Sequence, residues 1–191
     1  MNLKPKAKVG TSSFRREAQL NLLRNDIYVI GMRGNIDTRI HKLKNNEFDA
    51  IVLSLAGIQM LNLGNEVKEV FSDEEMLPAI GQGVIALQCK KDDQKTLNIL
   101  KKINHNETYY CIQAERALLE AIEGDCDTAI GGLAKLSNEK IILKSELFSD
   151  DGKKKFEAQG SGDFKEAKKI GYKVGNELLK KAGSDFTTQG S

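Results

Sequence analysis

Arginine is concentrated in one short stretch of this 191-residue chain. Five of its six arginines lie between residues 15 and 39, whereas its 23 lysines are spread over the whole sequence. A guanidinium can hold a carboxylate or a phosphate through two parallel N–H bonds, which an ammonium cannot do. A solvated basic surface would account for any one of these arginines, but the cluster favours a binding site for an anion.

Two stretches within this region share one arrangement. Gly10–Arg16 holds three hydroxyl side chains and two arginines at an expected strand-to-helix junction, and Arg33–Arg39 repeats the pattern after the next strand. A helix start offers free backbone N–H groups and the positive end of the helix dipole. The carboxyl ends of parallel strands meet at one sheet edge, so the spacing predicts a pocket for a ligand with several carboxylates. Neither stretch matches a P-loop or a dinucleotide-binding fingerprint.

Cys126 lies in a polar turn, Glu123–Thr128, after an expected helix. Its flanking aspartates would raise the pKa of the thiol, which disfavours a free nucleophile. We therefore interpret Cys126 as an attachment point or as a residue with no special role. Cys89 and Cys111 are expected in the core, and the two histidines are isolated. The sequence shows no metal-ligand spacing, so no metal site is predicted.

Strand and helix patterns alternate over residues 8–63, which predicts βαβ units and a parallel sheet. A further strand is expected at Val84–Cys89, and a helix at Gln94–Ile103. The earlier strands are expected at Lys8–Gly10, Ile27–Ile30 and Phe48–Leu53, and the helices between them at Phe14–Arg24, Ile36–Asn45 and Ala56–Leu63.

The second half of the chain has a different order of patterns. A long helix is expected over residues 106–123, capped by Asn106 or Thr108. Two strands within 128–147, a third near Lys154–Gln159 and a helix over 163–182 follow. This order predicts a small α+β domain with a three-stranded antiparallel sheet.

Composition excludes several classes of protein. With 40% hydrophobic residues, 29% charged residues and a net charge of +2, the chain is not a disordered one. It has no apolar run of membrane-spanning length and no secretory signal at its start. Three scattered cysteines fit a reducing cytoplasm. Since its net charge is near zero and its arginines are not interleaved with aromatics, binding to nucleic acid is not expected.

Six short motifs occur in order along the chain. Together they resemble the porphobilinogen deaminase (hydroxymethylbilane synthase) family of tetrapyrrole, porphyrin and haem biosynthesis, over residues 7–182. The resemblance implies a cytoplasmic transferase that joins four porphobilinogen molecules into hydroxymethylbilane, releasing ammonia, on a dipyrromethane primer. The motifs are Val9–Arg16, Met32–Arg39, Phe48–Leu53, Leu77–Gly83, Glu115–Ala117 and Glu123–Cys126.

The resemblance also assigns site residues. Cys126 matches the cysteine that holds the dipyrromethane cofactor through a thioether. The sequence departs from the family at Asp125, where a glycine is usual, at Ala129, where a proline is common, and at Met60, where an arginine often stands. The other cofactor-binding positions are matched by Ser13, Arg15, Arg16, Arg33, Arg39, Gln82 and Gly83, and the substrate-binding positions by Thr11, Arg15, Arg16 and Arg39.

The resemblance further implies how the chain is divided. Residues 1–83 would form most of an α/β domain of the periplasmic-binding-protein type, and residues 84–104 a strand and helix that return to an absent first domain. Residues 105–186 would form the C-terminal α+β domain, and 187–191 a disordered tail. No residue matches the catalytic aspartate of that first domain, which in the family stabilises developing positive charge.

We therefore expect a C-terminal piece of the enzyme that is inactive alone. The family is monomeric and acts on porphobilinogen and the growing polypyrrole, whereas apolar surface on residues 84–104 is expected to make this chain self-associate. The alternative is a non-catalytic module that binds carboxylates or other anions.

Overall fold

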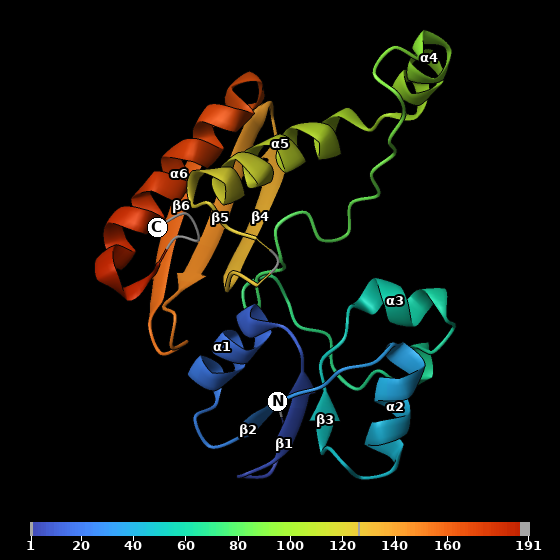
Figure 1. Cartoon of the computed structure of the whole chain (residues 1–191), viewed down its shortest axis with the longest axis vertical. Coiled ribbons are helices and arrows are strands. Elements are labelled where there is room, and N and C mark those ends of the chain that lie inside the picture. The colour runs from blue at the N-terminus through green and yellow to red at the C-terminus, as the bar shows by residue number, and fades with distance from the viewer. Residues whose placement is uncertain (1, 126, 188–191) are drawn as a thin grey trace.

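Two separate three-stranded sheets organise the chain in the computed structural model, which describes residues 2–125 and 127–187 (Figure 1). Cys126, the predicted attachment point, and residues 188–191 of the predicted tail lie outside the described residues. The first sheet is parallel, with strand order β2-β1-β3, and the second is antiparallel, with order β4-β5-β6. No helix among the described residues is long and apolar enough to cross a membrane.

The parallel sheet confirms the βαβ pattern predicted for residues 8–63. β1 (Lys8–Thr11) pairs on one side with β2 (Tyr28–Gly31) and on the other with β3 (Ala50–Ile51). The strand predicted at Phe48–Leu53 is wrong in length, because only two of its residues join the ladder. The helices that follow the three strands are α1 (Phe14–Leu23), α2 (Ile36–Lys44) and α3 (Leu55–Met60), and the short 3-10 helix η1 (Gly64–Glu66) comes next.

The antiparallel sheet confirms the α+β arrangement predicted for the second half. Its two long helices lie side by side on one face of the sheet, and they bury a shared core against it (Figure 1). His105 caps the first of these helices by accepting from the Thr108 N–H, so the caps predicted at Asn106 or Thr108 are wrong. The elements are α5 (Asn106–Ala121), β4 (Ile130–Ser137), β5 (Lys140–Phe148), β6 (Lys155–Asp163), η2 (Phe164–Glu166), α6 (Ala167–Ala182) and η3 (Gly183–Asp185).

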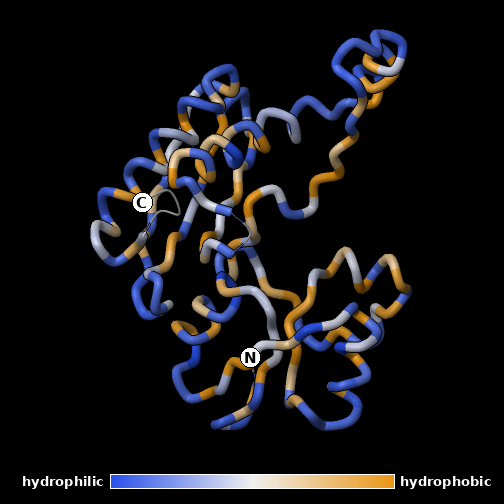
Figure 2. Tube along the Cα trace, in the orientation of Figure 1, coloured by the Kyte–Doolittle hydropathy of each residue, from blue (hydrophilic) through white to orange (hydrophobic). Residues whose placement is uncertain are grey.

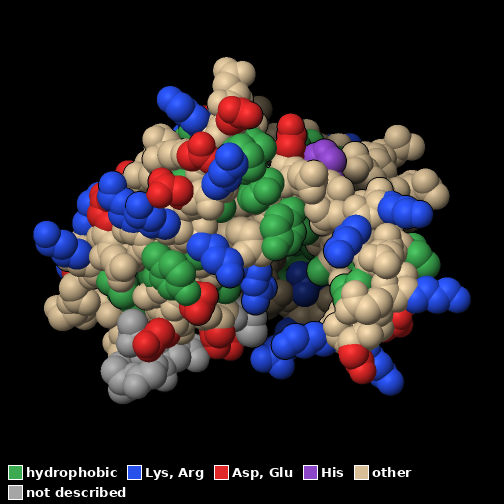
Figure 3. All heavy atoms as spheres, turned by 90° about the horizontal axis from the view of Figure 1, so that it is seen from above, with side chains coloured by type: hydrophobic (Ala, Val, Ile, Leu, Met, Phe, Trp, Pro, Cys, Tyr) green, Lys and Arg blue, Asp and Glu red, His purple; other side chains and the backbone are tan. Residues whose placement is uncertain are grey.

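Residues 84–103 form an arm that leaves the rest of the molecule (Figure 1). The strand predicted at Val84–Cys89 is wrong: these residues have no regular structure, since no neighbouring strand satisfies their backbone groups. The helix predicted at Gln94–Ile103 is confirmed as α4, but it buries none of its residues. Ile85 is 89% exposed. Hydrophobic residues follow the arm in Figure 2, and on the face of the molecule seen from above, hydrophobic side chains lie among charged ones (Figure 3).

Helices α5 and α6 approach each other most closely at Gly171. A Cβ placed there would overlap the Ala114 carbonyl oxygen and lie 2.7 Å from the Ala117 Cβ, so any larger residue must push the helices apart.

We predict that Gly171→Ala lowers the free energy of unfolding by about 1–3 kcal/mol, the usual range for overpacking. Alanine would otherwise stabilise a helix by about 1 kcal/mol relative to glycine. A loss of stability in Gly171→Ala would therefore come from the close contact between α5 and α6 and not from helix propensity. Urea unfolding measures the change, with Asn176→Ala on the exposed side of α6 as control. A stabilised Gly171→Ala would contradict this packing.

Candidate functional site

The ends of β1 and β2 lie side by side, as predicted. Their parallel register places Thr11 opposite Gly31, so the loops that follow both strands leave the same edge of the sheet. Arg39 joins the two loops: its Nη2 donates to the Ser12 Oγ at 3.0 Å, and its Nε donates to the Gly34 carbonyl at 2.7 Å.

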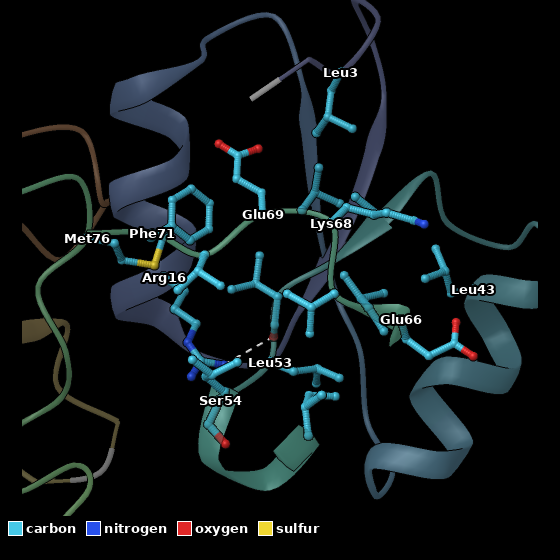
Figure 4. A pocket seen from close by; sticks show the side chains of 18 of the residues that line it. Leu3, Arg16, Leu43, Leu53, Ser54, Glu66, Lys68, Glu69, Phe71 and Met76 are labelled. Atoms are coloured by element: carbon cyan, nitrogen blue, oxygen red, sulfur yellow. Dashed lines mark hydrogen bonds between the residues drawn. The ribbon is translucent and has the colours of Figure 1, made fainter. Parts of the chain in front are cut away.

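Arg16 extends this arrangement to the third strand. Its Nη1 donates to the Val52 carbonyl oxygen, just beyond β3, at 3.1 Å (Figure 4). Burial lowers the pKa of Arg16, and repulsion from Arg39 lowers it further. Two guanidinium groups are therefore held near each other, at a site where an anion would relieve their repulsion.

Arg33 lies in the loop after β2 and is exposed. Within the described part of the chain it forms no hydrogen bond or ion pair, and no carboxylate pairs with Arg15, Arg16 or Arg39 either. Four arginines without an acidic partner leave their charges available to a ligand. This agrees with the anion-binding site that the arginine cluster in the sequence predicts.

The predicted hydroxyl donors shape the loop after β1. Thr11 is buried and its Oγ1 accepts from the Ser13 N–H at 3.3 Å, while the Ser13 Oγ caps α1 by accepting from the Arg16 N–H at 3.4 Å. A hydroxyl that accepts a hydrogen bond still has a proton to donate. Both side chains therefore hold the loop and keep a hydroxyl proton for a further acceptor.

Arg15 points to the junction between the two halves of the chain. It is only 5% exposed, and it donates to the Leu77 carbonyl through Nη1 and to the Gln82 Oε1 through Nη2 at 3.5 Å. Its Nε is buried without a partner among the described residues. Burial, with repulsion from Arg16 and against attraction from Glu146, lowers the pKa of Arg15 to about 10.

The segment Leu77–Gly83, which includes the predicted Gln82 and Gly83, connects the two halves. Gly81 and Gly83 have φ values of +72° and +84°, and the exposed Gln82 turns its Oε1 back to the Ala79 N–H at 3.2 Å. The Pro78 carbonyl accepts from Gly132 N–H of β4 at 2.9 Å. The segment is therefore fastened to both halves.

Glu115 is the residue at this junction that sequence reasoning missed. It lies on α5, is 6% exposed, and accepts from the Gly81 N–H at 2.8 Å and from the Ala134 N–H at 2.9 Å. Burial raises the pKa of Glu115, and the two N–H groups oppose that rise. A signal was present, because Glu115 is a charged residue within the apolar stripe of α5 that includes Cys111 and Leu118.

A cavity of about 690 Å³ lies beside Arg15 and Arg16. Most of its lining is apolar and comes from β3, α2, α3 and the extended residues 67–71, which cross it (Figure 4). A concave apolar site with a few fixed polar groups is typical of sites for organic ligands, and this volume lies within their range of roughly 300–1,000 Å³.

The loop that contains Cys126 is described on both sides of that residue. Asp125 organises it: one carboxylate oxygen accepts from the Asp127 N–H at 2.9 Å, from the Thr128 N–H at 3.1 Å and from the Thr128 hydroxyl at 3.2 Å. Asp127 and Thr128 line a second cavity, of about 420 Å³, together with Phe14 of α1. The residues that follow Cys126 thus lie beside the helix that carries Arg15 and Arg16.

No group of histidine, cysteine and acidic side chains suited to a metal ion occurs in the part of the chain that the structure describes.

Comparisons with known proteins agree on one family. The family model for "Porphobilinogen deaminase, dipyromethane cofactor binding domain" matches residues 1–98, and that for "Porphobilinogen deaminase, C-terminal domain" matches residues 109–180. The porphobilinogen deaminases of Coxiella burnetii strains CbuG_Q212 and RSA 493 / Nine Mile phase I are each 40% identical to this chain over 184 residues, which is 96% of this chain. The chain spans 60% of the length of these relatives.

We predict that Arg15→Met raises the free energy of unfolding at pH 7 by about 1 kcal/mol or more, because it removes a buried charge that forms no ion pair among the described residues and is only partly offset by attraction from Glu146. The pKa of Arg15 is lower in the folded chain than in the unfolded chain, so the charged Arg15 destabilises the wild-type fold. This destabilisation is complete below about pH 10 and declines as the pH rises further, so the gain in stability of Arg15→Met should decline as well. Urea unfolding at pH 7 and at pH 10.5 measures both effects.

The matched control is Arg33→Met, which should change the free energy of unfolding by less than about 0.5 kcal/mol, as is usual for exposed positions. A clear loss of stability in Arg15→Met at pH 7 would mean that its hydrogen bonds outweigh the buried charge.

Proposed function

The chain belongs to the porphobilinogen deaminase family, and we propose that it forms the part of a hydroxymethylbilane synthase that carries the dipyrromethane cofactor and binds the carboxylates of porphobilinogen. One observation carries this proposal. Arginines without an acidic partner gather at one sheet edge, and α1, which carries two of them, lies along a cavity that Asp127 and Thr128 of the loop after α5 also line. Such a cluster fits a ligand with several carboxylates, which describes both cofactor and substrate.

In this proposal Arg16, Arg33 and Arg39 bind acetate and propionate carboxylates of the cofactor and of incoming porphobilinogen. Thr11 and Ser13 donate their hydroxyl protons to the same oxygens, and each is already oriented by the backbone N–H that its oxygen accepts. The fixed loops after β1 and β2 reduce the ordering that binding would require.

Arg15, Gln82 and Gly83 are proposed to bind the cofactor from the other side. Gln82 is exposed and lies within reach of Arg15, whose buried guanidinium lacks a neutralising carboxylate. A cofactor carboxylate near Arg15 would supply the missing charge. This explains why a destabilising buried cation is present at this position.

Cys126 is proposed to hold the cofactor through a thioether, formed when its sulfur adds to a methylene pyrrole. The bound dipyrromethane supplies the primer to which the pyrroles are joined. Asp125 keeps the loop in a defined turn through three hydrogen bonds. The family usually has a glycine at this position, and in this chain the aspartate side chain orders the loop instead.

The remaining steps are assigned to residues outside this chain. No residue matches the aspartate that the family uses, so we expect the 191-residue chain to bind porphobilinogen without converting it.

Three further expectations remain predictions: the division of the chain at residues 83 and 104, the likeness of its first part to periplasmic binding proteins, and a cytoplasmic setting. A non-catalytic anion-binding module is not favoured, because both family models are those of the enzyme.

We predict that the chain binds porphobilinogen, and that Arg16→Met and Arg39→Met each weaken binding by about tenfold or more, since a charge-assisted hydrogen bond contributes about 1.5–3 kcal/mol. Isothermal titration calorimetry measures the dissociation constants. Acetate, with one carboxylate, should bind far more weakly than porphobilinogen.

Arg116→Met is the matched control, because Arg116 is exposed on α5 and away from the arginine cluster. Equal losses in Arg116→Met and Arg39→Met would show a general effect of net charge and contradict the site. Formation of hydroxymethylbilane by the purified chain would contradict the expectation that it is inactive alone.

We also predict concentration-dependent self-association through the arm at residues 84–103, because Ile85 and Ile103 expose apolar surface there. The double variant Ile85→Asp/Ile103→Asp should abolish it, as measured by light scattering. Met60→Asp removes an equally exposed apolar side chain outside the arm and should leave association unchanged. A wild-type chain that stays monomeric at high concentration would contradict the prediction.

A further inference from the structure

Glu115 connects three parts of the chain that are far apart in sequence. From α5, one carboxylate oxygen accepts from Gly81 in the connecting segment, and the other accepts from Ala134 in β4. Both bonds, at 2.8 and 2.9 Å, are short and involve an ionised acceptor, the kind of hydrogen bond that contributes most in a buried site.

Only an ionised carboxylate suits this position. It offers two acceptor oxygens and no donor, which matches two converging N–H groups. A glutamine would turn an NH₂ group toward one of these donors, and an alanine would leave both N–H groups buried without a partner. The chain keeps this charge although no cationic side chain contacts it among the described residues.

The two ends of this connection lead to the two halves of the proposed site. Gly81 adjoins Gln82, which accepts from Arg15, and Arg15 in turn holds the Leu77 carbonyl. On the other side, α5 ends at Ala121, six residues and about 9 Å of helix beyond Glu115, and the loop with Cys126 follows.

We propose that Glu115 is a positioning residue that holds α5, which precedes the loop with the cofactor cysteine, in place relative to the carboxylate-binding Arg15, by fastening α5 to the Gly81 backbone. This inference rests on the proposed function. Glu115 touches neither cofactor nor substrate in it and acts through the segment that it holds.

The first measurement does not depend on ligand binding. In Glu115→Gln, amide hydrogen exchange at Gly81 or Ala134 should become about tenfold faster or more, because one N–H loses its acceptor. Exchange at Leu143, in the core of the antiparallel sheet, should not change. Glu107→Gln, at the exposed start of the same helix, is the matched control. Unchanged exchange at both Gly81 and Ala134 would overturn the proposal.

The second measurement asks whether Glu115 acts through Arg15. Porphobilinogen affinity is measured for the wild-type chain, Glu115→Gln, Arg15→Met and the double variant. We expect each single variant to bind about tenfold more weakly, and the double variant to bind no more weakly than Arg15→Met alone. Residues that act through one another show such non-additive effects, whereas independent ones add.

The outcomes separate the two proposals. Wild-type binding with an unaffected Glu115→Gln, or with strictly additive losses, overturns the positioning role and leaves the proposed function standing. Absence of wild-type binding overturns the proposed function and, with it, the role of Glu115 in it. Weaker, non-additive binding by a Glu115→Gln chain that is still fully folded under the binding conditions, as its urea unfolding curve shows, supports the proposal.

Discussion

Two buried charges of opposite sign hold the segment Leu77–Gly83 between them. Arg15 donates to its Leu77 carbonyl, and Glu115 accepts from its Gly81 N–H. Neither charge contacts an oppositely charged side chain among the described residues, so polar groups solvate both: the segment supplies the Leu77 carbonyl to Arg15 and the Gly81 N–H to Glu115, and β4 supplies the Ala134 N–H. These bonds tie the segment, with the positive φ of Gly81, to α1 through Arg15 and to α5 through Glu115.

The arginines of the proposed anion site are likewise held by polar groups and not by carboxylates, although they are less buried than Arg15. Arg16 and Arg39 are held by the Val52 carbonyl and the Ser12 hydroxyl, which orient their charges but do not neutralise them. Repulsion between them lowers the pKa of Arg16 together with burial. A site prepared in this way is less stable when empty, and the binding of carboxylates recovers the difference. Such a trade of stability against function is common where a site is preorganised.

Local patterns in the sequence were sufficient for most of the fold. The helices and the antiparallel sheet follow from periodicity, and the loops after β1 and β2 meet because parallel strands share an edge. Contacts between distant residues were not accessible in this way. Val84–Cys89 has the composition of a strand but no partner to pair with, and Glu115 acquires its role from amides 19 and 34 residues away. Arg15 was expected only as a ligand for carboxylates, yet it also fastens the connecting segment.

The two halves of the chain differ in how firmly they are packed. The antiparallel sheet shares one continuous core with α5 and α6, whereas the parallel sheet has a small core around Val9 and Leu20 and borders a large cavity. The proposed cofactor cysteine therefore follows a helix of the well-packed half, and the proposed carboxylate-binding loops belong to the other. Glu115 is the side chain of α5 whose hydrogen bonds, among those of the described residues, reach both the connecting segment and β4, and this is why the proposed alignment of the two halves is assigned to it.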